Sequence, residues 1–273
     1  MATHGSAFPI AKLALNNNVP PILMASLRMG MVMLLLIPFW KFKIPDKKYL
    51  KSLILFSISM GVMVYVFMNL SLKYSSFISP IIIGAQLAVP FAVLLSAKMI
   101  GESISPKKWM YVILAFVGII IVFFDPELKN NLLGLFFASL MALFFAIAQV
   151  YSRQLKELSL IILNAYTGFF GFFVLIVVSF FVEGEVIINI KNINFESWIL
   201  ISYQALIVSL FAHMSMFYLY KFYTVGQIFP FYSLFPIFGI ILTFFIFGEL
   251  PSLLFFIGSF IVISSVILLQ KTK

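Results

Sequence analysis

The sequence predicts an all-α polytopic membrane protein with ten transmembrane helices, arranged as two inverted five-helix repeats. Three observations lead to this fold class. Hydrophobic residues make up 63% of the 273-residue chain and charged residues only 10%, whereas soluble domains are about 45–50% apolar and about 25% charged. The apolar residues form runs long enough to cross a bilayer, and lysines collect in alternate gaps between the runs. A soluble fold would lack the polar residues that cover its surface.

The apolar runs set the predicted spans. A transmembrane helix needs about 20 mostly apolar residues, and on this measure nine spans follow a shorter first one. The first covers only about 22 Å at 1.5 Å per residue and would place His4 and the amino terminus in mid-membrane, which costs free energy. We therefore expect this helix to be truncated, with further residues upstream; a helical stub is the alternative. The expected limits are 1–15, 20–40, 49–70, 76–98, 109–124, 132–152, 159–182, 198–220, 224–248 and 251–270.

The basic residues indicate how these spans are oriented. The net charge is +9. The basic residues divide unequally between the gaps on one face of the membrane and the gaps and termini on the other. Only Lys73, Lys129 and Lys191 fall on the first face. Because cytoplasmic loops are rich in lysine and arginine, we expect both termini to be cytoplasmic, in the bacterial cytoplasmic (inner) membrane, and no nucleic acid is needed to explain the charge. The other face holds Lys41, Lys43, Lys47, Lys48, Lys51, Lys98, Lys107, Lys108, Arg153, Lys156, Lys221, Lys271 and Lys273.

Two Gly-Glu turns indicate an internal repeat. Gly101-Glu102 follows the fourth predicted span and Gly248-Glu249 follows the ninth, with the glutamates 147 positions apart. Five spans per copy is an odd number, so the second copy has to lie inverted in the membrane. We expect the repeats to occupy 1–127 and 128–273. Inverted repeats recur in secondary transporters, whose substrate site lies near the midplane between the halves.

The motifs along the chain follow a known order and spacing. His4-Gly-Ser-Ala-Phe-Pro-Ile-Ala-Lys12 is followed by Pro20-Pro21 and Ala25-Ser-Leu-Arg28, then by Ile83-Gly-Ala-Gln86 through Gly101-Glu102, and by Phe229 to Glu249. Together they resemble the EamA-like branch of the drug/metabolite transporter superfamily, although His4 stands where that family usually has tryptophan and the half-span before it is absent. The resemblance implies a ten-helix inner-membrane carrier of small metabolites, often amino acids or their derivatives, that works by alternating access.

Two cations fall inside the predicted spans. Arg28 lies about 12 Å into its helix, where a charge is costly unless it is paired or faces water. It is therefore a candidate substrate-binding residue; a structural arginine that snorkels or caps carbonyl groups is the alternative. Lys12 is closer to the outer end of its span and is expected to snorkel.

Prolines interrupt two helices that correspond in the two repeats. Gln86 lies between one pair of prolines, and Ser233, at the offset of 147, lies between another pair. Backbone groups freed by proline are tolerated where they line a cavity, and paired broken helices point to a transporter site. We predict that Gln86 and Ser233 bind substrate, polar contact between helices being the alternative. The predicted gating positions or helix breaks are Pro80, Pro90, Pro230 and Pro236.

The eighth predicted span adds two polar candidates, Tyr203 and His213. An interfacial aromatic belt is the alternative for the tyrosine, and a hydrogen bond between helices is the alternative for the histidine. No acidic residue falls in the middle of a span. A proton-coupled carrier would therefore have to use His4, His213 or a terminal glutamate, and otherwise the protein is a facilitator or an exchanger.

The residues needed for disulfides, metal sites and several kinds of catalysis are absent from the sequence. The chain has no cysteine, which excludes disulfides and thiolate metal sites. It also lacks paired intramembrane carboxylates, a His-Glu-x-x-His motif and a phosphate-binding glycine loop. We expect no enzyme, no catalytic residue, no metal and no cofactor. The predicted function is secondary transport of carboxylate-bearing metabolites such as amino acids, with protons or a counter-substrate as coupling partners; a channel-like facilitator and, more distantly, a membrane-embedded enzyme are the alternatives.

Overall fold

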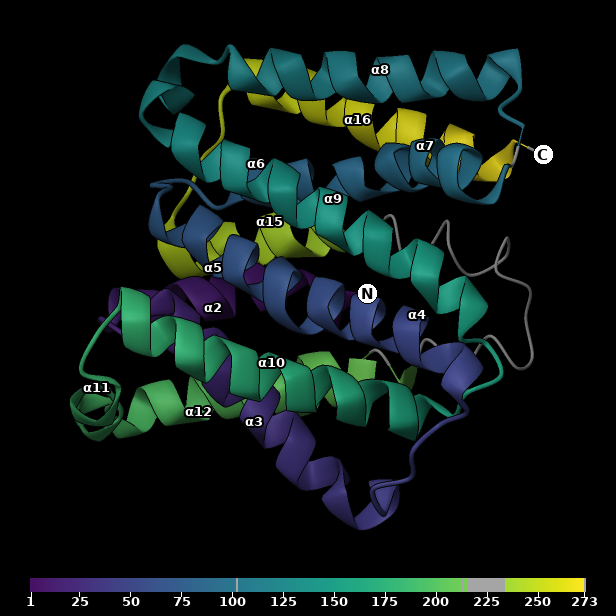
Figure 1. Ribbon diagram of the computed structural model, residues 1–273. Coiled ribbons are helices and arrows are strands. Elements are labelled where there is room, and N and C mark those ends of the chain that lie inside the picture. The colour runs from purple at the N-terminus through teal and green to yellow at the C-terminus, as the bar shows by residue number, and fades with distance from the viewer. Residues whose placement is uncertain (102, 213, 216–233, 273) are drawn as a thin grey trace.

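The structure is a computed structural model that describes residues 1–101, 103–212, 214–215 and 234–272. Within these ranges every regular element is a helix (Figure 1). Eight helical stretches are long and apolar enough to cross a membrane, so the chain is a multi-pass membrane protein. They are Pro21–Trp40, Lys47–Lys73, Ser79–Met99, Pro106–Phe123, Leu132–Gln154, Leu160–Val182, Phe195–Ala212 and Leu253–Lys271.

The first half of the chain begins with two short helices. Because they are short, the amino terminus lies among the other helices rather than at an end of the bundle (Figure 1). The elements are α1 (Ala2–Gly5), α2 (Ala7–Asn16), α3 (Pro21–Trp40), α4 (Lys47–Ser57), η1 (Ile58–Val64), α5 (Tyr65–Lys73), α6 (Ser79–Gly84), η2 (Ala85–Leu87), α7 (Ala88–Ile100) and α8 (Pro106–Phe123).

The second half begins with the longest helices of the described chain. The elements are η3 (Pro126–Asn131), α9 (Leu132–Gln154), α10 (Leu160–Val182), α11 (Val186–Asn192), α12 (Phe195–Tyr203), η4 (Gln204–Ala212), α15 (Phe235–Phe247) and α16 (Leu253–Lys271). Three of the ten predicted spans are not full-length helices in the described residues. The span 1–15 is formed by α1 and α2, the span 198–220 is described only to Ala212 and at 214–215, and the span 224–248 is described only from residue 234.

Two spans contain a widened, π-helical segment. η1 continues α4 into α5, and η4 continues α12. In such a segment each backbone N–H bonds to the carbonyl five residues back, and these segments often occur at functional sites. The two segments start at Ile58 and Gln204, 146 positions apart, close to the offset of 147 between the Gly-Glu turns.

The connections between helices lie at two opposite ends of the bundle, and hydrogen bonds link connections at the same end. At one end, Asn17 bonds to Ser197, and Ser252 donates to Asp125. We call it the Glu249 end; it comprises the connections 17–20, 74–78, 124–131, 183–194 and 248–252. At the opposite end, Ser52 donates to Gln154. We call it the lysine end; it comprises 41–46, 101–105, 155–159 and residue 272.

The lysine end holds an exposed ion pair. The Tyr49 hydroxyl donates to the Glu157 carboxylate, and Lys48 Nζ lies 3.9 Å from the same carboxylate. The hydrogen bond from Tyr49 first, and the charge of Lys48 second, lower the pKa of Glu157. The connection between α9 and α10 therefore keeps its negative charge among the lysines.

Two helix pairs pack along most of their lengths, α3 with α10 and α8 with α16 (Figure 1). Glycines allow the close approach. A Cβ atom on Gly118 would lie 2.9 Å from the carbonyl oxygen of Gly258 on the facing helix. A Cβ atom on Gly61 would lie 2.4 Å from the carbonyl oxygen of Thr167, so η1 and α10 touch backbone to backbone.

Two helices are capped at their N-termini by side chains from distant parts of the sequence. Ser105, Ser159, Asn194 and Ser252 cap their own helices through the side-chain oxygen, as such residues do. α3 and α6 have Pro20 and Ile78 at this position, and neither side chain can accept a hydrogen bond. Carboxylates bind the unpaired N–H groups instead, as a helix dipole favours.

The glutamates that accept these hydrogen bonds lie far away in sequence from the helices they cap. Glu183, after α10, accepts from the backbone N–H groups of Ile22 and Leu23, each at 2.8 Å. Glu249, after α15, accepts from Ile78 at 2.7 Å and from Ser79 at 2.8 Å. Each carboxylate thus fixes the end of one span to the start of another at the Glu249 end.

Candidate central cavity

A cavity of about 90 Å³ lies among the helices of the bundle. Because one water-sized sphere takes about 10–15 Å³, this cavity has room for several water molecules. Its described lining comes from α1, α2, α3, η1, α5, η2, α7, α9, η4 and α15, so both halves of the chain contribute. Thirteen of the eighteen lining residues are apolar. The polar ones are His4, Arg28, Tyr65, Gln86 and Gln149.

Arg28, on α3, is the charged residue of this lining. Its side chain is only 4% exposed. Nε donates to the Ser209 hydroxyl on η4 at 2.9 Å, and the guanidinium carbon lies 4.1 Å from the centre of the Tyr65 ring. The buried Nη1 has no hydrogen-bond partner among the described residues. A buried guanidinium group with an unused donor is costly, and a bound anion would offset that cost.

Gln86 is 3% exposed and also lines the cavity. It lies in η2, a tight 3₁₀ turn between α6 and α7. Pro90 has no N–H with which to bond the Gln86 carbonyl one α-helical turn back. The tight turn supplies a replacement, because backbone N–H groups at its end bond to the carbonyls of Ala85 and Gln86. Pro90 therefore explains why the helix changes locally from α to 3₁₀ beside the cavity.

The other prolines predicted as gating positions or helix breaks lie at the starts of helices or outside the described residues. Pro80 and Pro236 lie in the first turns of α6 and α15, where proline fits without breaking a helix. Pro230, and the substrate-binding candidates Ser233 and His213, lie outside the described residues.

Two further predicted residues make contacts between helices. The Tyr203 hydroxyl lies 2.8 Å from the Ser6 hydroxyl, and Tyr203 is not among the described lining residues. Lys12 Nζ donates to the carbonyl oxygens of Leu72 at 2.6 Å and Ser75 at 2.7 Å. These carbonyls lie at and just after the C-terminal end of α5, so Lys12 caps that helix.

Three lining or supporting residues were missed by sequence reasoning. Tyr65 and Gln149 fall near the ends of their predicted spans, where a polar side chain is ordinarily assigned to the membrane interface. Ser209 carries no sequence signal, since a serine in a membrane helix commonly bonds its own backbone. Tyr65 and Ser209 become candidates only once the structure shows that they contact the buried Arg28 side chain.

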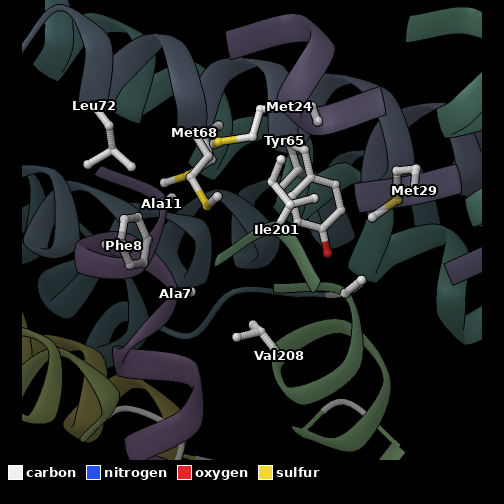
Figure 2. Close-up of a cluster of buried hydrophobic side chains, with 14 of the residues drawn as sticks. Ala7, Phe8, Ala11, Met24, Met29, Tyr65, Met68, Leu72, Ile201 and Val208 are labelled. Atoms are coloured by element: carbon white, nitrogen blue, oxygen red, sulfur yellow. The ribbon is translucent and has the colours of Figure 1, made fainter. Parts of the chain in front are cut away.

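The cavity is closed toward the Glu249 end. Four helices carry an apolar residue one turn beyond a lining residue, on the side of the Glu249 end. Each of these residues is at most 4% exposed. These four residues, which we call the apolar plug, are Ala11, Met24, Leu72 and Ile82. Figure 2 shows Ala11, Met24 and Leu72 packed with lining residues of α2, α5 and η4, among them Phe8, Met68 and Val208. In the other direction the lining reaches Gln149, only five residues before the end of α9 at the lysine end.

These features define a polytopic α-helical membrane protein with a central, cation-bearing cavity between its two halves. The chain belongs to the EamA-like transporter family, whose sequence profile matches residues 1–124 and again 132–270. This confirms the resemblance found in the sequence, including the assignment to the drug/metabolite transporter superfamily. Membership indicates a membrane transporter of small compounds.

Solved structures resemble this fold. One crystal structure superposes with a TM-score of 0.53 over 97% of this chain and 94% of that chain, at 14% sequence identity. At this identity the likeness concerns the fold alone. No curated protein sequence matches the chain.

Proposed function

We propose that this protein is a secondary transporter that carries small carboxylate-bearing metabolites, amino acids and related compounds, by alternating access. The observation that carries the proposal is the state of Arg28. It lies 4% exposed on the wall of a central cavity with Nη1 unpaired among the described residues. A cation held in this way at membrane depth marks a binding site by default, and a carboxylate is its natural partner.

The alternating-access part of the proposal rests on ten spans in two inverted repeats, 1–127 and 128–273. The π-helical segments η1 and η4 recur at nearly the offset of the Gly-Glu turns. Packing also repeats: the third span of the first repeat contacts α9, the first span of the second, while α12 contacts α2. These reciprocal contacts are expected of halves related by a two-fold axis in the membrane plane.

The orientation follows from charge. Eleven of the thirteen basic residues predicted to be cytoplasmic belong to the described part of the chain, at or near the lysine end. By the positive-inside rule we propose that the lysine end, where the described chain ends at residue 272, faces the cytoplasm of a bacterium, while the amino terminus lies inside the bundle. The apolar plug faces outside, and the cavity is offset toward the cytoplasm. This is the arrangement of an inward-facing carrier.

Exchange in proteoliposomes tests the proposal. We expect saturable uptake of labelled carboxylates that is accelerated by unlabelled substrate inside, whereas a channel would show neither saturation nor exchange. Per reconstituted molecule, Arg28→Gln should lower exchange by at least about tenfold, since a hydrogen bond to a charged group contributes about 1.5–3 kcal/mol. Lys12→Gln is the matched control: it removes a helix cap and should lower yield, but not exchange per molecule. Flux that rises linearly with concentration, or normal exchange by Arg28→Gln, contradicts the proposal.

The coupling ion is a separate question with its own test. His4 lines the cavity, and no acidic residue does so among the described residues. If protons drive transport, His4→Gln combined with His213→Gln should abolish acceleration by a pH gradient and leave exchange intact. Persistence of that acceleration in the double variant would contradict histidine coupling.

A further inference from the structure

The acidic residues of the chain are distributed away from the cavity. Of the nine in the sequence, none is among the described lining residues. Seven have described side chains, and all seven lie in connections or at helix ends. Residue 213 and residues 216–233, outside the described residues, include no aspartate or glutamate. The seven are Asp46, Asp125, Glu157, Glu183, Glu185, Glu196 and Glu249.

The remaining cavity wall is apolar. Methionine, phenylalanine, valine and alanine side chains make up the thirteen apolar lining residues, among them Phe8, Met60 and Met141. The polar groups other than Arg28 and His4 are neutral: the Tyr65 hydroxyl and the amides of Gln86 and Gln149. The described part of the wall therefore has one permanent cation, Arg28, and a large apolar surface, and none of its residues is acidic.

An α-amino acid would fit such a wall poorly. Its carboxylate could pair with Arg28, but its ammonium group would leave water and meet only neutral acceptors. A desolvated charge without an opposite charge is strongly disfavoured. An anion of the same size that lacks the ammonium group avoids this cost and still places an apolar body against the methionines and phenylalanines.

From these features we infer the substrate class of the cavity: a monoanionic carboxylate with an apolar aryl or branched-alkyl body and no ammonium group, such as a 2-oxo acid or an aryl-alkanoate. The inference rests on the proposed transport function and changes its substrate class, because carboxylates without an ammonium group take the place of the amino acids named there. Arg28 Nη1 holds the carboxylate, Tyr65 keeps the guanidinium group in place from one face, and the apolar wall receives the body.

Three probes that share a phenyl body separate the contributions of charge. They are 3-phenylpropionate, an anion; phenylalanine, a zwitterion; and phenethylamine, a cation. Binding to the purified full chain is measured by thermal shift in detergent, because a ligand of the folded state raises its Tm. We expect half-maximal stabilisation by 3-phenylpropionate at a concentration at least about tenfold lower than by phenylalanine, and none by phenethylamine. The pair 4-methyl-2-oxopentanoate and leucine should show the same order.

Two variants sharpen this experiment. Arg28→Gln should remove the preference for 3-phenylpropionate. Gln149→Glu adds a carboxylate to the wall and should shift the preference toward phenylalanine; it also keeps the test valid if Arg28→Gln does not fold. Tighter binding of phenylalanine than of 3-phenylpropionate, with exchange of amino acids in proteoliposomes, overturns the inference and leaves the transport proposal standing. If none of these acids binds or exchanges, the transport proposal fails as well.

Discussion

The guanidinium group of Arg28 lies 4.1 Å above the ring of Tyr65, and the two side chains come from α3 and α5 on the wall of one cavity. The ring is a partner that does not neutralise the cation, so the charge remains available to a ligand. Such a cation–π contact contributes about 0.5–2 kcal/mol, more when it is desolvated.

Tyr65 can be tested through the ring and the hydroxyl separately. Tyr65→Phe keeps the ring and should change the affinity for 3-phenylpropionate by less than about threefold. Tyr65→Leu removes the ring and should weaken binding by about threefold to thirtyfold, because the guanidinium group loses its support. Thermal-shift titration of the purified variants measures both. Equal losses in the two variants would assign the effect to the hydroxyl and contradict the cation–π role.

Ser209 holds the other side of the same guanidinium group. Ser209→Ala leaves Nε of a buried cation without its acceptor, which costs about 1–3 kcal/mol, so the Tm in detergent should fall. Ser57→Ala is a matched control, since Ser57 is fully buried and its hydroxyl has no partner among the described residues. That variant should be neutral. If Ser57→Ala lowers the Tm as much as Ser209→Ala does, the loss cannot be assigned to the hydrogen bond between Arg28 and Ser209.

The carboxylate caps at the Glu249 end should stabilise the fold through their charge. Glu249→Gln and Glu183→Gln keep the shape of the side chain but weaken two hydrogen bonds to a helix N-terminus. Each should cost about 1–2 kcal/mol and lower the Tm. Glu185→Gln, at an exposed position nearby, should not. Unchanged Tm values in both cap variants would mean that water serves these helix ends equally well.

Helix packing at Gly61 predicts a steric penalty. Alanine there would place a Cβ atom 2.4 Å from the Thr167 carbonyl, whereas alanine at Gly84 meets only the Ala138 Cβ atom at 3.2 Å. Overpacking of this kind costs about 1–3 kcal/mol. Gly61→Ala should therefore give a clearly lower Tm and folded yield than Gly84→Ala. The reverse order would contradict the close approach of η1 and α10.

Much of the fold could be predicted from sequence because membrane spans follow from local composition. Runs of about 20 apolar residues and the placement of lysines require no knowledge of tertiary contacts. Arg28 and Gln86 were selected for the same reason, since a polar residue in such a run is exceptional. Both line the cavity, and their role in binding stays a prediction. The first two helices were harder, because they are too short for the length rule to apply.

The contacts of the site could not be predicted in this way. Tyr65 and Ser209 approach Arg28 only because α3, α5 and η4 meet, and nothing local in the sequence encodes that meeting. The carboxylate caps are similar: Glu183 lies 161 positions from Ile22, whose N–H it binds. A glutamate in a connection looks solvated until the uncapped helix beside it is known. The contact of Tyr203 is of the same kind, because its hydroxyl lies beside that of Ser6, 197 positions away in the sequence.

Cysteine reactivity measures the central claim most directly: a water-accessible, electropositive cavity around Arg28, closed at the Glu249 end. The chain has no cysteine, so Met141→Cys on the wall and Leu72→Cys in the apolar plug each introduce a single reporter. Both are treated with an anionic and a cationic methanethiosulfonate reagent in inverted membrane vesicles, and rates are expressed relative to an exposed cysteine.

We expect the reporter at position 141 to react and to favour the anionic reagent by about tenfold, with that preference lost when Arg28→Gln is added, while the reporter at position 72 stays unreactive. Equal reactivity at the two positions, or a preference that survives the loss of Arg28, would contradict the account.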